Sequence, residues 1–388
     1  MKKLFSNYIF SIAVYAGVLF TSCQKDDFLI SNAPTNFSEV FETFWNKMNI
    51  NYVYWDIDTT DWDAVYKRYK PIFAQLDLKK HADNLKSVQY FDDMTKGLID
   101  GHYHISFSNA AIAGSSVYPS FERKQNLAKF HYPYSYYALD TSYLDPNFKK
   151  VSDYNNTYNG YPLTILCGSI DNKIIFFSCT NFSLFKSFYS NSANGVKVTL
   201  QFFFNKLANL PENIKGIIID VRGNQGGDLA DLNFLVGHFI DKPLHFGYTR
   251  SKSGNGRLDY TPWIKAIITP EPNAKAIRIP IIVLADLNSA SLSEAVVMAI
   301  KAIPNGIFIG ETTWGATGPI TDEEVYNDGQ FGIPNFLTVL TSSCTFKYID
   351  GKIYEGIGFS PDITLPFNSY EINIGKDAQL EKAISLFH

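Results

Sequence analysis

The sequence predicts an α/β fold in which a small helical domain precedes a core built on a largely parallel sheet. In the second half of the chain, continuous apolar runs at 216–221, 281–285 and 306–310 are typical of strands that are buried on both faces. Helical stretches at 194–207 and 292–303 alternate with these runs. Alternation of this kind predicts a parallel sheet with helices packed outside it.

Composition limits the classes of function. The chain has 388 residues, enough for two domains, and nearly half of them are apolar. The formal net charge of −4, from 34 basic and 38 acidic residues, gives no broad attraction to nucleic acid, so no nucleic-acid partner is expected. Neither the glycine spacing of dinucleotide sites nor a phosphate loop is present, and no zinc-ligand spacing occurs. We therefore expect no cofactor and no metal.

The N-terminus has the features of an export signal. Two lysines precede an apolar run at 8–20, which is shorter than the roughly 20 residues of a membrane-spanning helix. Small residues then precede Cys23, and this segment resembles a bacterial lipoprotein cleavage site. The resemblance implies a signal peptide at 1–22, a lipidated Cys23, a polar tether at 23–35 and anchoring to the outer membrane, on either face. An ordinary cleaved signal that happens to contain cysteine is the alternative.

The first domain, predicted at 36–108, consists of about three helices. Asn36 is a candidate N-cap because a glutamate follows three residues later and apolar residues then recur at helical spacing. A second helix is expected to start at Asp61 and to be limited by Pro71. A third helical pattern covers 88–99.

Residues 109–161 are rich in Tyr, Asn, Ser and Pro without a sustained period, which predicts an irregular insertion. The α/β core is expected at 162–388. Apart from Cys23 the chain has three cysteines, so a disulfide framework is not the basis of the fold. Cys167 and Cys179 flank a plausible hairpin turn and could pair, but three buried free thiols (the third is Cys344) are an equally good interpretation.

Two segments after buried strands could carry chemistry. The serine-rich stretch 287–294 lies between a strand and a helix, where the helix dipole and unpaired amides favour negative charge. A plain serine N-cap is the alternative interpretation. Glu294, in the first turn, is expected to interact with the helix dipole. The glycine-rich loop 220–228 lets backbone amides approach a ligand, and its spacing fits an oxyanion hole better than a phosphate site.

A serine nucleophile also needs a general base. His102 lies where the helical domain meets the core, but its position alone does not distinguish it from the other histidines of the chain.

Five segments in this order along the chain resemble motifs of the C-terminal-processing peptidases and the tricorn protease core. They are Asp-Gly-His at 100–102, the loop 220–227, Asn-Ser-Ala-Ser-Leu-Ser-Glu at 288–294, the segment 310–315 and the closing segment 350–362. The resemblance implies a Clp protease/crotonase-like spiral αβ core and identifies Ser291 as the nucleophile.

One departure selects between branches of this family. Many members have a catalytic lysine at the position that is Ala316 here, and no lysine lies nearby. The tricorn-like branch uses histidine instead, which makes His102 the expected base and Glu355 its indirect support. The residue before that histidine is serine in tricorn and Gly101 here, which leaves the relay between Glu355 and His102 open.

The resemblance further implies an oxyanion hole formed by the amides of Leu292 and Gly227, with Gly226 as a further candidate. No PDZ-like segment is evident. The predicted function is a serine-type endopeptidase of the cell envelope that acts on proteins or peptides. Two alternatives are a catalytically silent scaffold that binds peptides or partners, and a crotonase-like lyase or hydrolase, for which no coenzyme A signal is present.

Overall fold

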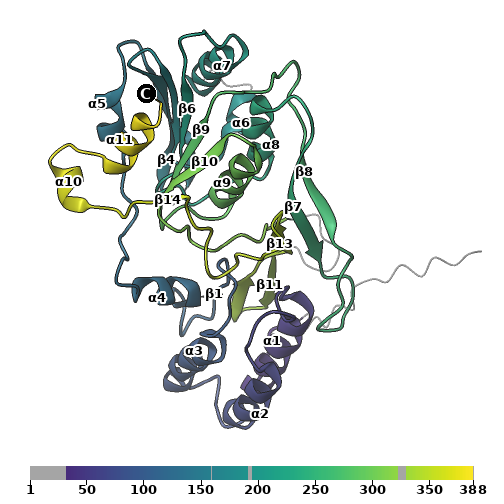
Figure 1. The fold of residues 1–388 in the computed structure, drawn as a ribbon. Coiled ribbons are helices and arrows are strands. Elements are labelled where there is room, and N and C mark those ends of the chain that lie inside the picture. Colours follow the sequence, from purple (N-terminus) through teal and green to yellow (C-terminus); the bar gives the residue numbers. More distant parts are fainter. Residues whose placement is uncertain (1–31, 159, 191–194, 322–328, 388) are drawn as a thin grey trace, which may run out of the picture.

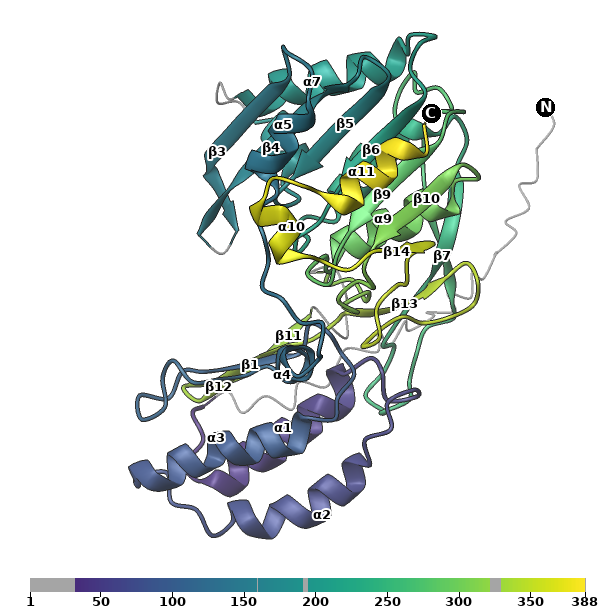
Figure 2. The same cartoon turned by 60° about the vertical axis from the view of Figure 1, so that its left-hand side comes forward.

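The computed structural model describes residues 32–158, 160–190, 195–321 and 329–387. The predicted signal peptide, Cys23 and most of the tether lie outside these residues. Among the helices of the described ranges, none has both the length and the apolar character that crossing a bilayer requires. Figures 1 and 2 show a main sheet flanked by helices at one end of the molecule and a three-helix unit at the other.

The N-terminal unit contains the three predicted helices, α1 (Phe37–Asn51), α2 (Trp62–Phe73) and α3 (His81–Thr95). Asn36 is the N-cap of α1, since its side-chain oxygen accepts the Glu39 N–H at 3.0 Å. The expected limit at Pro71 was wrong, because α2 runs through this residue. Pro71 lies in the last turn, where it removes a single hydrogen bond, and the buried Tyr69 and Phe73 hold the turn against the core. Helix α3 begins earlier than predicted, because its first turns are mostly polar.

A small antiparallel sheet closes this unit with strands from both ends of the chain. Its order is β11-β12-β1-β2, formed by β11 (Gln330–Ile333), β12 (Leu337–Leu340), β1 (His104–Phe107) and β2 (Ser116–Val117). Phe331 and Val339 share one buried cluster with Phe44 and Phe91 of the helices. The helical unit is therefore completed by residues far from the predicted range 36–108.

The main sheet is mixed, with a parallel majority. From one edge to the other its strands are β14 (Ile363–Thr364), β10 (Gly306–Gly310), β9 (Ile281–Ala285), β6 (Gly216–Asp220), β5 (Ile174–Cys179), β4 (Tyr161–Ile170) and β3 (Lys149–Tyr158). Pairing is parallel from β14 to β5 and antiparallel at β4 and β3. The predicted α/β class with a helical N-terminal region is confirmed.

The prediction of an irregular insertion at 109–161 was wrong in part. This segment forms β2, then α4 (Pro119–Gln125) and α5 (Tyr137–Tyr143), and ends in the long edge strand β3. The strand gave no clear sequence period because it is at the sheet edge and its pairing with β4 shifts register between Asp153 and Thr157.

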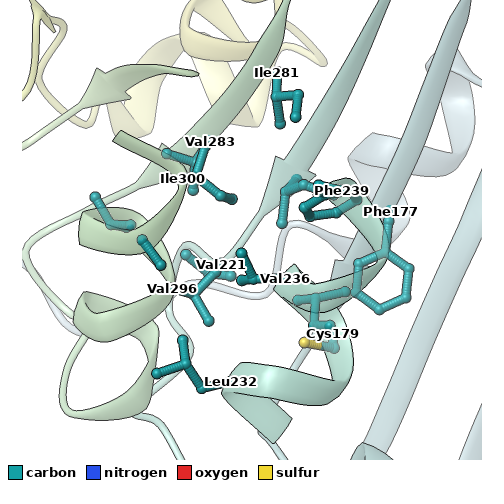
Figure 3. Close-up of a cluster of buried hydrophobic side chains, with 14 of the residues drawn as sticks. Phe177, Cys179, Val221, Leu232, Val236, Phe239, Ile281, Val283, Val296 and Ile300 are labelled. Atoms are coloured by element: carbon teal, nitrogen blue, oxygen red, sulfur yellow. The ribbon is translucent and has the colours of Figure 1, made fainter. Parts of the chain in front are cut away.

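Helices cover both faces of the main sheet. One face carries α6 (Leu184–Phe188), α7 (Gly195–Ala208), α8 (Ala230–Val236), the 3₁₀ turn Gly237–Phe239 and α9 (Leu292–Ala302), and the other carries α5, α10 (Ser369–Asn373) and α11 (Ala378–Ser385). Figure 3 shows Val283 of β9 in one buried cluster with Val296 and Ile300 of α9 and with Leu232 and Val236 of α8. This packing fixes the start of α9 relative to the sheet.

A third sheet, of order β13-β7-β8, extends from the core toward the helical unit (Figure 1) and consists of β13 (Cys344–Tyr348), β7 (Leu244–Ser251) and β8 (Ile264–Ile268). The connection between β7 and β8 reaches α2, where Arg257 forms an ion pair with Asp63 at 2.6 Å. Cys167, Cys179 and Cys344 are buried free thiols, which answers the question that the sequence left open.

Candidate active site

Ser291 lies at the junction of β9 and α9, in a backbone conformation that side chains rarely adopt. Its φ is +54° and its ψ is −119°. Such strain persists only where the surroundings hold it, and it is typical of functional positions. The Ser291 N–H donates to Oε2 of Glu294 at 3.2 Å. The predicted nucleophile is thus presented at the first turn of a buried helix.

Glu294 does more than interact with the helix dipole. Its Oε1 accepts the Thr313 hydroxyl at 2.6 Å and the Gly315 N–H at 2.7 Å, and its Oε2 accepts the Ala316 N–H at 2.7 Å. Burial raises the pKa of this carboxyl group, and the donors oppose that effect. Glu294 therefore fixes the loop 313–316 against the nucleophile helix.

The glycine loop after β6 packs directly on Ser291. Gly226 has a φ of +105°, and a Cβ atom there would lie 2.8 Å from the Cβ of Ser291. The Gly226 N–H donates to the Asn224 side chain at 2.8 Å, so the expectation that this amide contributes to an oxyanion hole was wrong. Gly226 instead permits the close approach of the two segments.

The other two predicted amides remain available. Within the described residues, no hydrogen bond occupies the N–H of Gly227 or that of Leu292. The Asn224 carbonyl ties the loop to the nucleophile segment by accepting the Ala290 N–H at 3.2 Å and the Ser293 hydroxyl at 2.6 Å. Two unpaired donors are thus held beside Ser291, as an oxyanion site requires.

His102 is oriented by a hydroxyl group that sequence analysis missed. Its Nδ1 lies 3.4 Å from Oγ of Ser342, and this hydroxyl donates to Oδ1 of Asp100 at 2.9 Å. A serine hydroxyl has one proton, so Ser342 accepts from Nδ1–H of His102. This arrangement leaves Nε2 unprotonated. Burial lowers the pKa of His102, and the charge of Asp100 opposes that shift.

Glu355 supports the His102 segment through the backbone. Its Oε1 accepts the Gly101 N–H at 2.6 Å, and its Oε2 accepts the N–H groups of Thr317 and Gly318, each at 2.8 Å. A Cβ atom on Gly101 would lie 2.5 Å from the Gly315 carbonyl oxygen, so a serine does not fit here. Burial, reinforced by the charge of Asp100, raises the pKa of Glu355 to about 8.

Asp100 and Ser342 are candidate site residues that sequence analysis did not assign. Asp100 belongs to a motif that was recognised, but it received no role. Ser342 lies in a Thr-Ser-Ser stretch after β12 that gave no signal. Asp100 is fully buried and also accepts the Thr341 hydroxyl at 2.7 Å and the Ser342 N–H at 2.8 Å.

Asp100, His102 and Glu355 offer ligand atoms within 4.8 Å of one another, which is close enough to consider a cation. All four carboxylate oxygens, however, accept hydrogen bonds from surrounding N–H and O–H groups. The donor set therefore fits a hydrogen-bonded support for the imidazole better than a metal centre.

Ser291 and His102 line the same cavity of about 480 Å³. No hydrogen bond joins the Ser291 hydroxyl to the His102 ring in the part of the chain that the structure describes. Much of the remaining wall is apolar, and it comes from α8, α9, the third sheet, the segment 316–320 and Leu340 of β12. It includes Leu229, Leu232, Phe246, Ile268, Ala295 and Phe346.

Two models of known protein families match segments of this chain. The model of peptidase family S41 matches residues 185–365, and that of the tricorn protease C1 domain matches residues 33–77. The first match contains Ser291, Ser342 and Glu355, and the second contains α1 and α2, whereas His102 lies in neither. Over these segments the chain is similar to the C-terminal-processing and tricorn-like peptidases, the resemblance that its motifs predict.

Among curated proteins, the nisin-resistance protein of Lactococcus lactis is 29% identical over 39% of this chain and 46% of its own length. The carboxy-terminal processing protease CtpA of Bacillus subtilis is 28% identical over 40% of this chain and 30% of its own length. The chain thus matches less than half of either relative.

A candidate peptidase from Parabacteroides merdae has a similar crystal structure, with a TM-score of 0.69 over 91% of this chain and 97% of that one. At 22% identity this likeness shows the fold alone.

Proposed function

We propose that this chain is a serine-type endopeptidase of the cell envelope, with Ser291 as nucleophile and His102 as general base. The observation that carries the proposal is the shared cavity, in which Ser291 and His102 both line the wall and the free N–H groups of Gly227 and Leu292 lie beside the nucleophile. In the ligand-free state of such enzymes, the distance between nucleophile and base is often longer than a hydrogen bond and shortens when substrate binds.

In the proposed reaction, Nε2 of His102 takes the proton of the Ser291 hydroxyl as the oxygen attacks the peptide carbonyl carbon. The negative charge that forms on the carbonyl oxygen is stabilised by the amides of Gly227 and Leu292. Protonated His102 gives its proton to the leaving amine, and water then hydrolyses the acyl-enzyme. Ser342 and Asp100 hold the imidazole in the required tautomer throughout.

The apolar wall of the cavity supports a preference for peptides with an apolar side chain beside the cleaved bond. Attachment to the membrane through Cys23 is proposed on the sequence of the first 23 residues alone.

The test is cleavage of a diverse peptide library by the purified chain without its signal segment. The wild type is expected to cleave peptides with apolar residues, and Ser291→Ala is expected to abolish cleavage. Ser385→Ala is the matched control, since this exposed serine at the end of α11 contacts only its own helix. Binding without cleavage by the wild type would instead support the silent-scaffold alternative.

A further inference from the structure

A second cavity, of about 370 Å³, lies between α4 and the loops 312–315 and 356–357. The loop 313–316 separates this cavity from the active site, so the two cavities lie on opposite sides of the loop. Gly315 lines this second cavity, whereas the next residue, Ala316, lines the cavity of Ser291. The reaction proposed above makes no use of this space.

Three cations line the second cavity, namely Arg123, Lys124 and Lys129. Lys124 is only 9% exposed, and its ammonium group makes no hydrogen bond or ion pair with any residue that the structure describes. Its one specific contact is with the face of Trp314, at 5.9 Å from the ring centroid. A buried cation without an anionic partner is costly, so this position favours an incoming anion.

No carboxylate of the described chain forms an ion pair with these three cations, although the charges of Asp58, Asp100 and Glu122 act on Arg123. The described lining contains no acidic side chain. The carboxylates that act on Lys124 are Glu294 and Glu355, and all four of their oxygens already accept hydrogen bonds from backbone N–H and hydroxyl groups. Burial and the like charges of Lys129 and Arg123 lower the pKa of Lys124, and a bound anion would relieve that repulsion.

The rest of the wall combines the apolar side chains of Leu127, Leu287, Trp314 and Ile357 with the hydroxyl groups of Ser120, Thr312 and Thr313. A ligand that pairs with the cations and also contacts the apolar side chains carries an anionic group next to an apolar one. We propose that this cavity binds a peptide carboxylate flanked by an apolar side chain, as a docking site separate from the nucleophile. The inference depends on the proposed function in one respect, because the ligand is taken to be a peptide on that ground.

The carboxylate could be a chain terminus or an Asp or Glu side chain, and binding experiments separate these sources. The full mature chain with Ser291→Ala is titrated with three fluorescent peptides of the same apolar sequence. One has a free C-terminus, one is amidated, and one is amidated but carries Glu beside the apolar residue. Because this variant lacks the nucleophile, the binding result is independent of whether the wild type cleaves.

At least one carboxylate-bearing peptide is expected to bind about tenfold or more tightly than the uncharged amidated peptide, as expected for a charge-assisted hydrogen bond. Lys124→Gln should remove most of that difference. Lys129→Gln should reduce it too, and this exposed side chain can be changed without disturbing the core. Lys197→Gln, on an exposed position of α7, is the matched control and should have no effect.

Equal binding of all three peptides, or binding that Lys124→Gln and Lys129→Gln leave unchanged, would overturn the proposal. Displacement of the peptide by inorganic phosphate at concentrations near the peptide's own Kd would show a general anion site and overturn the assignment to peptides.

Discussion

Ser342 places a hydroxyl group between the Asp100 carboxylate and the imidazole of His102. We therefore predict that Ser342→Ala lowers kcat about 10- to 100-fold, because the ring loses the acceptor that fixes its tautomer. KM should change little, since Ser342 contacts the base and not the substrate. Ser343→Ala is the matched control. Its hydroxyl pairs with Thr321 and not with His102, so steady-state kinetics should show kcat near the wild-type value.

The environment of His102 also predicts a pH profile. Burial lowers the pKa of the ring below its ordinary value of 6.5 despite the opposing charge of Asp100. Only the neutral imidazole can accept the Ser291 proton, so kcat/KM should rise with pH through this lowered pKa and level off above it. We expect the midpoint of the acid limb to lie below 6.5. A midpoint above 6.5 would show that Asp100 dominates over burial.

Sequence motifs were sufficient to propose a nucleophile, a base and the supporting Glu355, but they did not reveal the rest of the hydrogen-bonded support. Ser291, His102 and Glu355 lie in recognisable motifs, and the structure brings Ser291 and His102 to one cavity. Ser342 comes from a distant stretch that only the fold carries next to His102. The spatial exclusion of a serine at position 101 depends on the Gly315 carbonyl, which sequence does not reveal.

Among the elements, the glycine loop after β6 determines how closely Gly226 and the Ser291 segment approach each other. Gly226→Ala should lower kcat/KM about 100-fold, because the added Cβ would push against Ser291 and displace the oxyanion donors. Gly351→Ala is the matched control. Gly351 also has a positive φ, +86°, but nothing lies within 4 Å of its Cβ position.

Both substitutions should cost stability on the order of 1 kcal/mol from backbone strain, measured by chemical denaturation. Only Gly226→Ala should lose activity. Comparable kinetics in the two variants would contradict the close approach assigned to Gly226.

Secondary structure was predictable where burial makes the pattern strong. The central strands β6, β9 and β10 are continuous apolar runs, and the structure places them at the predicted positions. The edge strand β3 lacks such a run, and its irregular pairing hid it. Pro71 illustrates the reverse case, since a local rule predicted a helix end that packing of Tyr69 and Phe73 overrides.

At the scale of the whole molecule, the helical unit and the core are interwoven. Strands β11 and β12 complete the sheet on which α1 and α3 pack, so the predicted unit 36–108 lacks part of its own core. We predict that a fragment of residues 32–118 fails to fold alone, as judged by rapid amide hydrogen exchange. The same fragment joined through a flexible linker to residues 329–341 should regain protected amides. Protection in the unlinked fragment would contradict this view.

The interweaving also explains how the proposed base, from the first third of the chain, comes to line one cavity with the proposed nucleophile, from the last third. His102 precedes β1, and β1 pairs with β12, which leads directly to Ser342. The placement of Ser342 beside His102 follows from long-range strand pairing, which no local sequence pattern specifies.

The central claim is that His102 makes the Ser291 hydroxyl nucleophilic, and covalent labelling tests it most directly. A fluorophosphonate probe, followed by peptide mass spectrometry, should modify Ser291 in the folded wild type. The rate of labelling should fall at least about 100-fold in His102→Ala, as expected when a general base is removed. Absence of labelling at Ser291, or labelling that is equally fast without the imidazole, would contradict the account.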